Sequence, residues 1–200
     1  RFHLKELSPD TSKVRTLITE TNDKFIDPWV QRFRVLPDQD VLFWTSERNG
    51  IQQVFLYNLN AKADSEASTN AEQAATLVNA VTPAHLFMRA IKGIDAKKSH
   101  LYFEGSGINA NSTDSDPYFR YLYRVDFNGA NLHLLTPEAV MHNTYVSPDF
   151  ATFTDTYSTV DTVPEHVLRS TESGQILARL YQVDNRTLLA KTGYKPPQPF

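Results

Sequence analysis

The 200-residue sequence contains no cysteine, and several other features are scarce. Without cysteine there is no disulfide framework, no thiolate nucleophile and no cysteine-ligated zinc site. Apolar runs are short, and none approaches the roughly 18 residues that cross a bilayer. The net charge of −3 is small, which argues against a nucleic-acid groove or a polybasic membrane surface. The composition therefore indicates a globular chain and leaves its compartment open.

Long amphipathic helical patterns are scarce as well. The best candidate, residues 63–77, is rich in Ala, but its Ser, Thr and Asn content favours a polar loop with about one helical turn. Strand signals dominate instead. Short segments rich in aromatic and β-branched residues lie at 41–47, 52–59, 99–105, 119–127, 131–136, 150–158 and 175–183. Turn pairs such as Asn49-Gly50 and Asn128-Gly129 lie between them, so we predict an all-β fold.

The strand pattern repeats three times along the chain. FRVLPDQDVLFWTSE, MRAIKGIDAKKSHLYFEGS and NTYVSPDFATFTDTYS each read as a short strand, a turn with an aspartate and an aromatic strand, followed by two further strands. The turn aspartates Asp38, Asp95 and Asp149 recur about every 55 residues. A four-stranded antiparallel unit that recurs in this way is typical of a β-propeller blade, whereas a β-sandwich does not repeat such a unit.

These repeats predict a β-propeller fragment of about three to four four-stranded antiparallel blades within residues 1–193. We expect an incomplete first blade at 1–27 and further blades at about 29–82, 86–137 and 142–183. Closed propellers need roughly four to eight blades, so this chain is not expected to close by itself. The sequence begins at Arg1 and ends in GYKPPQPF, and we expect residues 194–200 to begin a linker within a longer protein.

Ser46, Glu47 and Arg48 place a hydroxyl, a carboxylate and a guanidinium side by side in the sequence. A nucleophilic serine of a hydrolase usually lies in a G-x-S-x-G elbow beside a base, and no G-x-S-x-G occurs here. Ser46 instead precedes Asn49-Gly50, which is a strong hairpin signal. We therefore predict that Glu47 and Arg48 brace a turn, and we predict no catalytic residue in this chain.

Motifs for metal binding are weak. The polar loop 109–116 offers oxygen ligands, but it lacks the spacing and the fixed glycine of an EF-hand loop. The histidines are too dispersed for a local metal motif, and we expect His142 to be a hydrogen-bonded structural residue. Asp155 falls on the packed face of its strand and needs a partner, which we expect from a tyrosine or backbone N–H of a neighbouring blade. We predict no metal site and no cofactor.

The order of the segments LFWTSERNG, FLYNL, LYFEG, YLYRVDFNGANLHLLTP and SPDFATFTDTYSTVDTVPEHVLRSTESGQILARL resembles the later propeller blades of the dipeptidyl peptidase IV family of the prolyl oligopeptidase clan. The resemblance covers nearly the whole chain. It implies a parent serine exopeptidase that removes N-terminal dipeptides with Pro or Ala at the second position. For such a parent we expect a periplasmic, extracellular or membrane-anchored location.

The resemblance also implies which parts of the enzyme lie elsewhere. In this family the Ser-Asp-His triad belongs to an α/β-hydrolase domain that follows the propeller, and this chain does not contain that domain. The glutamate pair that holds the substrate's amine lies earlier in the propeller, and no Glu-Glu pair occurs in the sequence.

Phe33 and Arg34, in WVQRFRVLPDQD, are the residues that the resemblance points to as substrate-binding. A segment of this character lines the substrate pocket of the family with a Phe and an Arg. An aromatic ring packs on a substrate side chain, and a guanidinium binds a carbonyl or carboxylate through two donors. The alternative is that Phe33 belongs to the strand core and Arg34 is a surface charge.

The sequence as a whole predicts a substrate-gating and substrate-positioning propeller portion that is inactive without the hydrolase domain. Its expected partners are a peptide substrate and that C-terminal domain, with no nucleic acid. Exposed strand edges and blade faces lead us to expect either self-association or marginal stability. The alternative is a non-enzymatic propeller that serves as an interaction platform, as in WD-repeat or TolB-like proteins. The sequence that follows residue 200 in the parent distinguishes the two.

Overall fold

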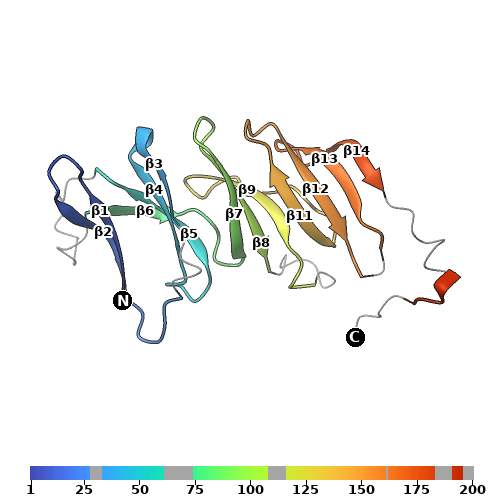
Figure 1. The fold of residues 1–200 in the computed structure, drawn as a ribbon, viewed down its shortest axis with the longest axis horizontal. Coiled ribbons are helices and arrows are strands. Elements are labelled where there is room, and N and C mark those ends of the chain that lie inside the picture. The colour runs from blue at the N-terminus through green and yellow to red at the C-terminus, as the bar shows by residue number, and fades with distance from the viewer. Residues whose placement is uncertain (28–32, 61–73, 108–115, 161, 183–190, 196–200) are drawn as a thin grey trace. The chain divides into compact units, whose positions relative to one another are not determined.

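A computed structural model describes residues 1–27, 33–60, 74–107, 116–160, 162–182 and 191–195 of the chain. In this part the chain forms a two-stranded and three four-stranded antiparallel sheets (Figure 1), which confirms the predicted all-β propeller fragment. Within these ranges no helix is long and apolar enough to cross a bilayer. The chain divides into two compact units, Arg1–Ala84 and His85–Phe200.

Four of the sequence predictions fall wholly or partly outside the described residues. They concern the polar loop within 63–77, the loop at 109–116, the part of the WVQRFR segment that precedes Phe33, and the linker expected at 194–200. The blade boundaries predicted from the repeats stay a prediction.

The first unit contains a hairpin and a four-stranded sheet. The hairpin pairs β1 (Phe2–Leu7) with β2 (Val14–Glu20). The sheet has the order β3 (Phe33–Leu36), β4 (Val41–Ser46), β5 (Gln53–Asn58) and β6 (Thr76–Ala80). Alternating large apolar residues bury one continuous core between the hairpin and the sheet, which includes Ile18, Leu42, Trp44 and Phe55.

The turns of this sheet follow their sequence signals. A short 3-10 turn, Pro37–Gln39, joins β3 to β4, and it ends at Asp40 in a left-handed conformation. Between β4 and β5 the amide of Gly50 donates to the carbonyl of Glu47 at 2.8 Å, and Gly50 has a φ of +83°. A glycine adopts this φ without the strain of a Cβ atom, which explains the Asn-Gly signal.

The second unit contains two four-stranded sheets of the same topology. The first has β7 (Phe87–Asp95), β8 (His100–Ser106), β9 (Tyr121–Asp126) and β10 (His133–Leu134), in the order β10-β9-β8-β7. The second has β11 (Met141–Val146), β12 (Thr152–Ser158), β13 (Glu165–Ser170) and β14 (Ile176–Gln182), in sequence order. Tyr102, Leu122 and Leu135 from one side and Val146 and Phe153 from the other form the core between them.

Two turns of the last sheet fix its position against the sheet before it. Phe150, in the turn before β12, stacks on Tyr102 with ring centroids 5.8 Å apart. Its ring lies so close to Gly93 that a Cβ atom there would approach it to 2.7 Å. In the turn between β13 and β14, Gly174 lies against the carbonyl oxygen of Leu135. The two sheets of this unit therefore meet through close contacts that tolerate no added atoms.

Candidate functional site

Phe33 and Arg34 begin the edge strand β3. Phe33 pairs with Trp44 of β4, and Arg34 pairs with Phe43. Phe33 is 47% exposed, so it is not a core residue of this unit. Arg34 is exposed as well. The strand therefore presents an aromatic ring and a guanidinium in succession, one on each face of β3.

The hydrogen bonding of Arg34 is local. Its Nη1 donates to the carbonyl oxygen of Phe33 at 2.9 Å. A guanidinium has five N–H donors in a planar fork, and no further contact of Arg34 is present among the described residues.

Ser46 belongs to a buried polar cluster in the first unit. Glu20, at the end of β2, is 8% exposed and accepts hydrogen bonds from the Trp44 indole N–H at 2.6 Å and the Ser46 hydroxyl at 2.7 Å. Ser46 itself is 1% exposed, so its hydroxyl does not face a substrate and serves as a buried donor. The cluster satisfies the buried carboxylate and joins the hairpin to the sheet.

Arg48 completes this cluster from the turn after β4. Its Nε donates to the Ser46 hydroxyl at 2.9 Å and its Nη1 to the Tyr57 hydroxyl at 2.7 Å, and its Nη2 lies 3.4 Å from Glu20. The guanidinium also lies over the Phe55 ring, 4.3 Å from its centroid. Arg48 therefore braces the turn as the sequence predicted, but through Glu20, a partner that local sequence does not indicate.

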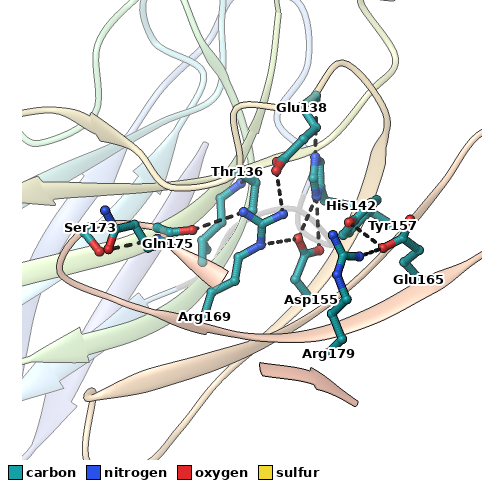
Figure 2. A network of polar contacts seen from close by, with 12 residues as sticks. Thr136, Glu138, His142, Asp155, Tyr157, Glu165, Arg169, Ser173, Gln175 and Arg179 are labelled. Carbon is teal, nitrogen blue, oxygen red and sulfur yellow. Dashed lines mark hydrogen bonds and ion pairs between the residues drawn. The ribbon is translucent and has the colours of Figure 1, made fainter. Parts of the chain in front are cut away.

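A second, more deeply buried network connects the strands of the last sheet (Figure 2). The Nδ1 of His142, on β11, lies 3.1 Å and 3.0 Å from the two carboxylate oxygens of Asp155, on β12. Both side chains are almost fully buried, at 1% and 0% exposed. His142 and Asp155 fall on the same face of the sheet because Thr144 pairs with Asp155 and His142 lies two residues before Thr144.

Arg169 brings a positive charge into the same network from β13. Its Nε forms an ion pair with Asp155 at 3.0 Å, its Nη2 donates to Glu138 at 2.9 Å, and its Nη1 donates to the Gly174 carbonyl at 3.0 Å. The Arg169 side chain is 2% exposed, which a charged residue tolerates only when it is paired. The guanidinium also lies 5.5 Å from the centroid of the Tyr157 ring.

Tyr157, Glu165 and Arg179 form the outer end of the network (Figure 2), where the Arg179 and Glu165 side chains are 61% and 25% exposed. The Tyr157 hydroxyl donates to Glu165 at 2.9 Å, and Glu165 also pairs with Arg179 of β14. Burial raises the pKa of Tyr157, and its hydrogen bond to the Glu165 carboxylate raises that pKa further. Tyr157 therefore keeps its proton and acts as a donor.

The network confirms the structural role predicted for His142, and it shows which side chains contact Asp155. The contacts place His142 and Arg169 of its own sheet against Asp155, two partners that the sequence analysis did not name. The local sequence does not indicate that Glu138 and Arg169 pair, because an arginine in a segment such as EHVLRST looks the same whether it is buried or solvated. Within the described ranges no group of three or more His, Asp or Glu residues is arranged to hold a metal ion.

Comparison with known proteins now identifies the family. The model of the dipeptidyl peptidase IV (DPP IV) N-terminal region matches residues 1–164. The chain belongs to this family. The resemblance of its segments to the propeller of DPP IV-like enzymes is thereby confirmed.

Solved structures of DPP IV-like enzymes share the fold. The dipeptidyl peptidase 4 of Porphyromonas gingivalis superposes with a TM-score of 0.71 at 16% identity, over 97% of our chain and 24% of that protein. A putative dipeptidyl aminopeptidase IV from Bacteroides ovatus superposes with a TM-score of 0.70 at 19% identity, over 92% of our chain and 26% of that protein. The chain thus spans about a quarter of each of these two proteins.

Proposed function

We propose that this chain positions and gates peptide substrates in a serine exopeptidase that releases N-terminal dipeptides with Pro or Ala at the second position. An α/β-hydrolase domain of the prolyl oligopeptidase type supplies the catalytic triad, and the chain alone is inactive. The membership in the DPP IV N-terminal family supports this proposal. The observation that carries it is the exposed Phe33–Arg34 pair on β3, in a chain of that family.

In the proposed role Phe33 and Arg34 act on different parts of the substrate. The exposed Phe33 ring offers an apolar face for a substrate side chain. Arg34 offers its remaining N–H donors to a substrate carbonyl or carboxylate, and a charge-assisted hydrogen bond of this kind contributes about 1.5–3 kcal/mol. Neither residue takes part in bond making. Their contribution is to hold the peptide in place while the hydrolase domain acts.

The proposal is tested in the full-length parent enzyme with a chromogenic Gly-Pro dipeptide reporter. We expect cleavage by the parent and none by the 200-residue chain. Arg34→Ala is expected to lower kcat/KM by roughly tenfold or more, mainly through KM, because it removes substrate binding and not the chemical step. Arg34→Lys is expected to restore little, since an ammonium does not reproduce the planar fork of donors.

Arg120→Ala is the matched control, because Arg120 is also an exposed arginine and lies outside the proposed site. It is expected to leave the kinetic constants unchanged. If the parent does not cleave the reporter, the exopeptidase proposal fails and an interaction platform takes its place. If the parent is active and Arg34→Ala behaves like Arg120→Ala, the role of Arg34 fails while the activity stands.

A further inference from the structure

Two bulges interrupt the pairing of β7 with β8. In the first, Arg89 lies between two paired residues of β7 and has no partner of its own in the register with β8. In the second, Lys92 is the extra residue in the same way. A bulge changes the direction of the side chain at the extra residue, and bulges occur often beside functional sites. The strand β7 therefore directs two cationic side chains away from the regular ladder.

The two cations have different surroundings. The Nζ of Lys92 lies 3.0 Å from Glu104, and the two side chains are 19% and 8% exposed, so this pair is largely buried and neutral. Arg89 is exposed, and no carboxylate pairs with it in the part of the chain that the structure describes. Lys92 thus balances a buried acid of its own sheet, whereas the charge of Arg89 is not used within the described fold.

Uncharged groups hold the Arg89 guanidinium in place. Its Nε donates to the hydroxyl of Ser106 at 3.1 Å, and Ser106 is 1% exposed. Its Cζ lies over the Phe87 ring, 4.6 Å from the centroid. The four N–H donors on the two Nη atoms have no further partner among the described residues. A guanidinium that is oriented in advance loses less side-chain entropy when a ligand binds.

Other exposed arginines of the chain are oriented by acids. Arg15 pairs with Glu6 across the hairpin. Arg179 pairs with Glu165 across the last sheet. Such a pairing fixes the side chain but neutralises it, whereas a hydroxyl and a ring fix Arg89 and leave its charge available. A guanidinium with two free Nη groups matches the geometry of a carboxylate, which it binds through two parallel hydrogen bonds.

The place of Arg89 in the repeat resembles that of Arg34. The strands β3 and β7 are each the first strand of a four-stranded sheet and lie at its edge. Each carries a phenylalanine that is followed within two residues by an exposed arginine, Phe33 and Arg34 in β3 and Phe87 and Arg89 in β7. The same strand of two successive repeats thus presents an aromatic ring together with a guanidinium.

We propose that Arg89 is a carboxylate-binding residue and that its ligand is a carboxylate of the peptide substrate. The identity of the ligand rests on the proposed function, whereas the carboxylate site rests on the contacts of Arg89 itself. A peptide presents this group at its C-terminus and on acidic side chains. Arg89 is then a specificity-determining residue, because a peptide with a carboxylate within its reach binds better than the same peptide with an amide.

The proposal is tested in the full-length parent enzyme with three peptides of equal length. They are Gly-Pro-Ala-Gln-Ala with a C-terminal carboxamide, the same peptide with a free C-terminal carboxylate, and Gly-Pro-Ala-Glu-Ala with a C-terminal carboxamide. Release of Gly-Pro is followed by liquid chromatography. We expect a peptide with a carboxylate to exceed the uncharged peptide in kcat/KM by roughly tenfold. Which of the two carboxylate peptides shows the preference distinguishes the C-terminus from the acidic side chain.

Arg89→Gln is expected to reduce this ratio to about one, because the amide removes the positive charge and the fork of donors. The matched control is Arg120→Gln, which removes an exposed arginine that lies outside β7 and is expected to keep the ratio. If the parent cleaves all three peptides equally well, or if the preference persists in Arg89→Gln, the proposal is wrong.

Binding is also measured without cleavage, from the Nε–H NMR signal of Arg89 in the 200-residue chain during titration with the same peptides. We expect a saturable shift with a carboxylate peptide and none with the uncharged peptide, while the Arg120 signal stays in place. A parent that cleaves no peptide, combined with this response of Arg89, would refute the exopeptidase activity and leave the carboxylate site standing. Equal responses to the charged and uncharged peptides would refute the site.

Discussion

Arg169 and Arg179 lie on neighbouring strands of the last sheet, and both pair with carboxylates. Arg169 is 2% exposed and pairs with Asp155 and Glu138, whereas Arg179 is 61% exposed and pairs with Glu165. Removing one member of a buried pair leaves an uncompensated charge, but an exposed pair is solvated and screened in any case. The same residue type thus has two different energetic roles one strand apart.

Arg169→Leu is expected to lower the free energy of unfolding by about 3–5 kcal/mol, because it leaves the Asp155 carboxylate buried without its cation. Chemical denaturation of the chain measures this change. Arg179→Leu is the matched control and should have a far smaller effect. Equal effects of the two substitutions would show that the buried pairing of Arg169 does not stabilise the sheet.

His100, on β8, gives the stability of the fold a pH dependence. Burial lowers the pKa of His100 and the nearby Arg124 lowers it further, which outweighs the opposing effect of Asp126 at 3.4 Å. The unfolded chain therefore binds this proton more readily than the folded chain. Stability contributed by neutral His100 is present above about pH 6.5 and is lost as the pH falls below it.

The measurement is the free energy of unfolding of the chain and of His100→Gln between neutral and mildly acidic pH. We expect the loss of stability on acidification to be shallower in the variant than in the unmodified chain. His133→Gln, at an exposed histidine of β10, is the matched control for the effect of the substitution itself. A steeper slope in His100→Gln would contradict the lowered pKa of His100.

At the level of elements, the β13–β14 turn packs closely against the backbone of Leu135 at Gly174. Gly174 has a φ of +74°, and a Cβ atom built there would lie 2.4 Å from the carbonyl oxygen of Leu135. Gly50, in the β4–β5 turn, has a similar φ of +83° but has no atom within 4 Å of its Cβ position. The two glycines therefore share the backbone requirement and differ in the space around them.

Alanine at either glycine costs about 1–2 kcal/mol for the left-handed conformation. Gly174→Ala is expected to cost about 1–3 kcal/mol more than Gly50→Ala, because the backbone of Leu135 must move. Thermal unfolding of the two variants measures the difference. Equal midpoints would mean that the turn relaxes away from Leu135 at no cost.

The elements of this fold are predictable where local pattern decides them. The strands β4, β5 and β8 coincide closely with the predicted segments at 41–47, 52–59 and 99–105, because aromatic and β-branched residues alternate and turn residues limit them. β10 is shorter than predicted, since His133–Leu134 forms the strand where 131–136 was expected, although the Leu135 amide still donates to the Leu122 carbonyl of β9 at 2.8 Å. Its edge position lets pairing end early.

The polar networks were not predictable in the same way. Glu20 meets Ser46 across 26 residues of sequence, and Glu138 meets Arg169 across 31 residues. No local period links such pairs, and one sequence alone does not show which strands become neighbours. Phe33 and Arg34 were found through the resemblance to a family, and their substrate contact stays a prediction.

At the scale of the whole molecule, the edge strand β14 exposes apolar side chains. It ends the order of its sheet, and no strand pairs with its outer edge among the described residues. Leu177, Leu180 and Tyr181 on this strand are each more than half exposed. An apolar edge with free backbone groups is a template for another strand, although the bulges in β14 weaken it.

We expect the isolated chain to self-associate through this edge in a concentration-dependent way. The double substitution Leu177→Lys and Leu180→Lys should shift it toward monomer, because charges on an edge strand oppose pairing. Sedimentation velocity over a range of concentrations measures the shift. Val160→Lys adds a charge at an exposed site off the strands and should not change association. A chain that stays monomeric at its highest soluble concentration would refute the expectation.

The buried acids Glu20 of the hairpin and Glu104 and Asp155 of two four-stranded sheets have a consequence for how strands pair during folding. Strands of similar pattern recur along one chain, so a strand from one repeat risks joining the sheet of another during folding. Glu20 requires Trp44 and Ser46, Glu104 requires Lys92, and Asp155 requires a histidine and an arginine. A misplaced strand leaves such a carboxylate without its cation or donors. We therefore expect the polar clusters to favour native strand pairing over pairing with a strand of another repeat.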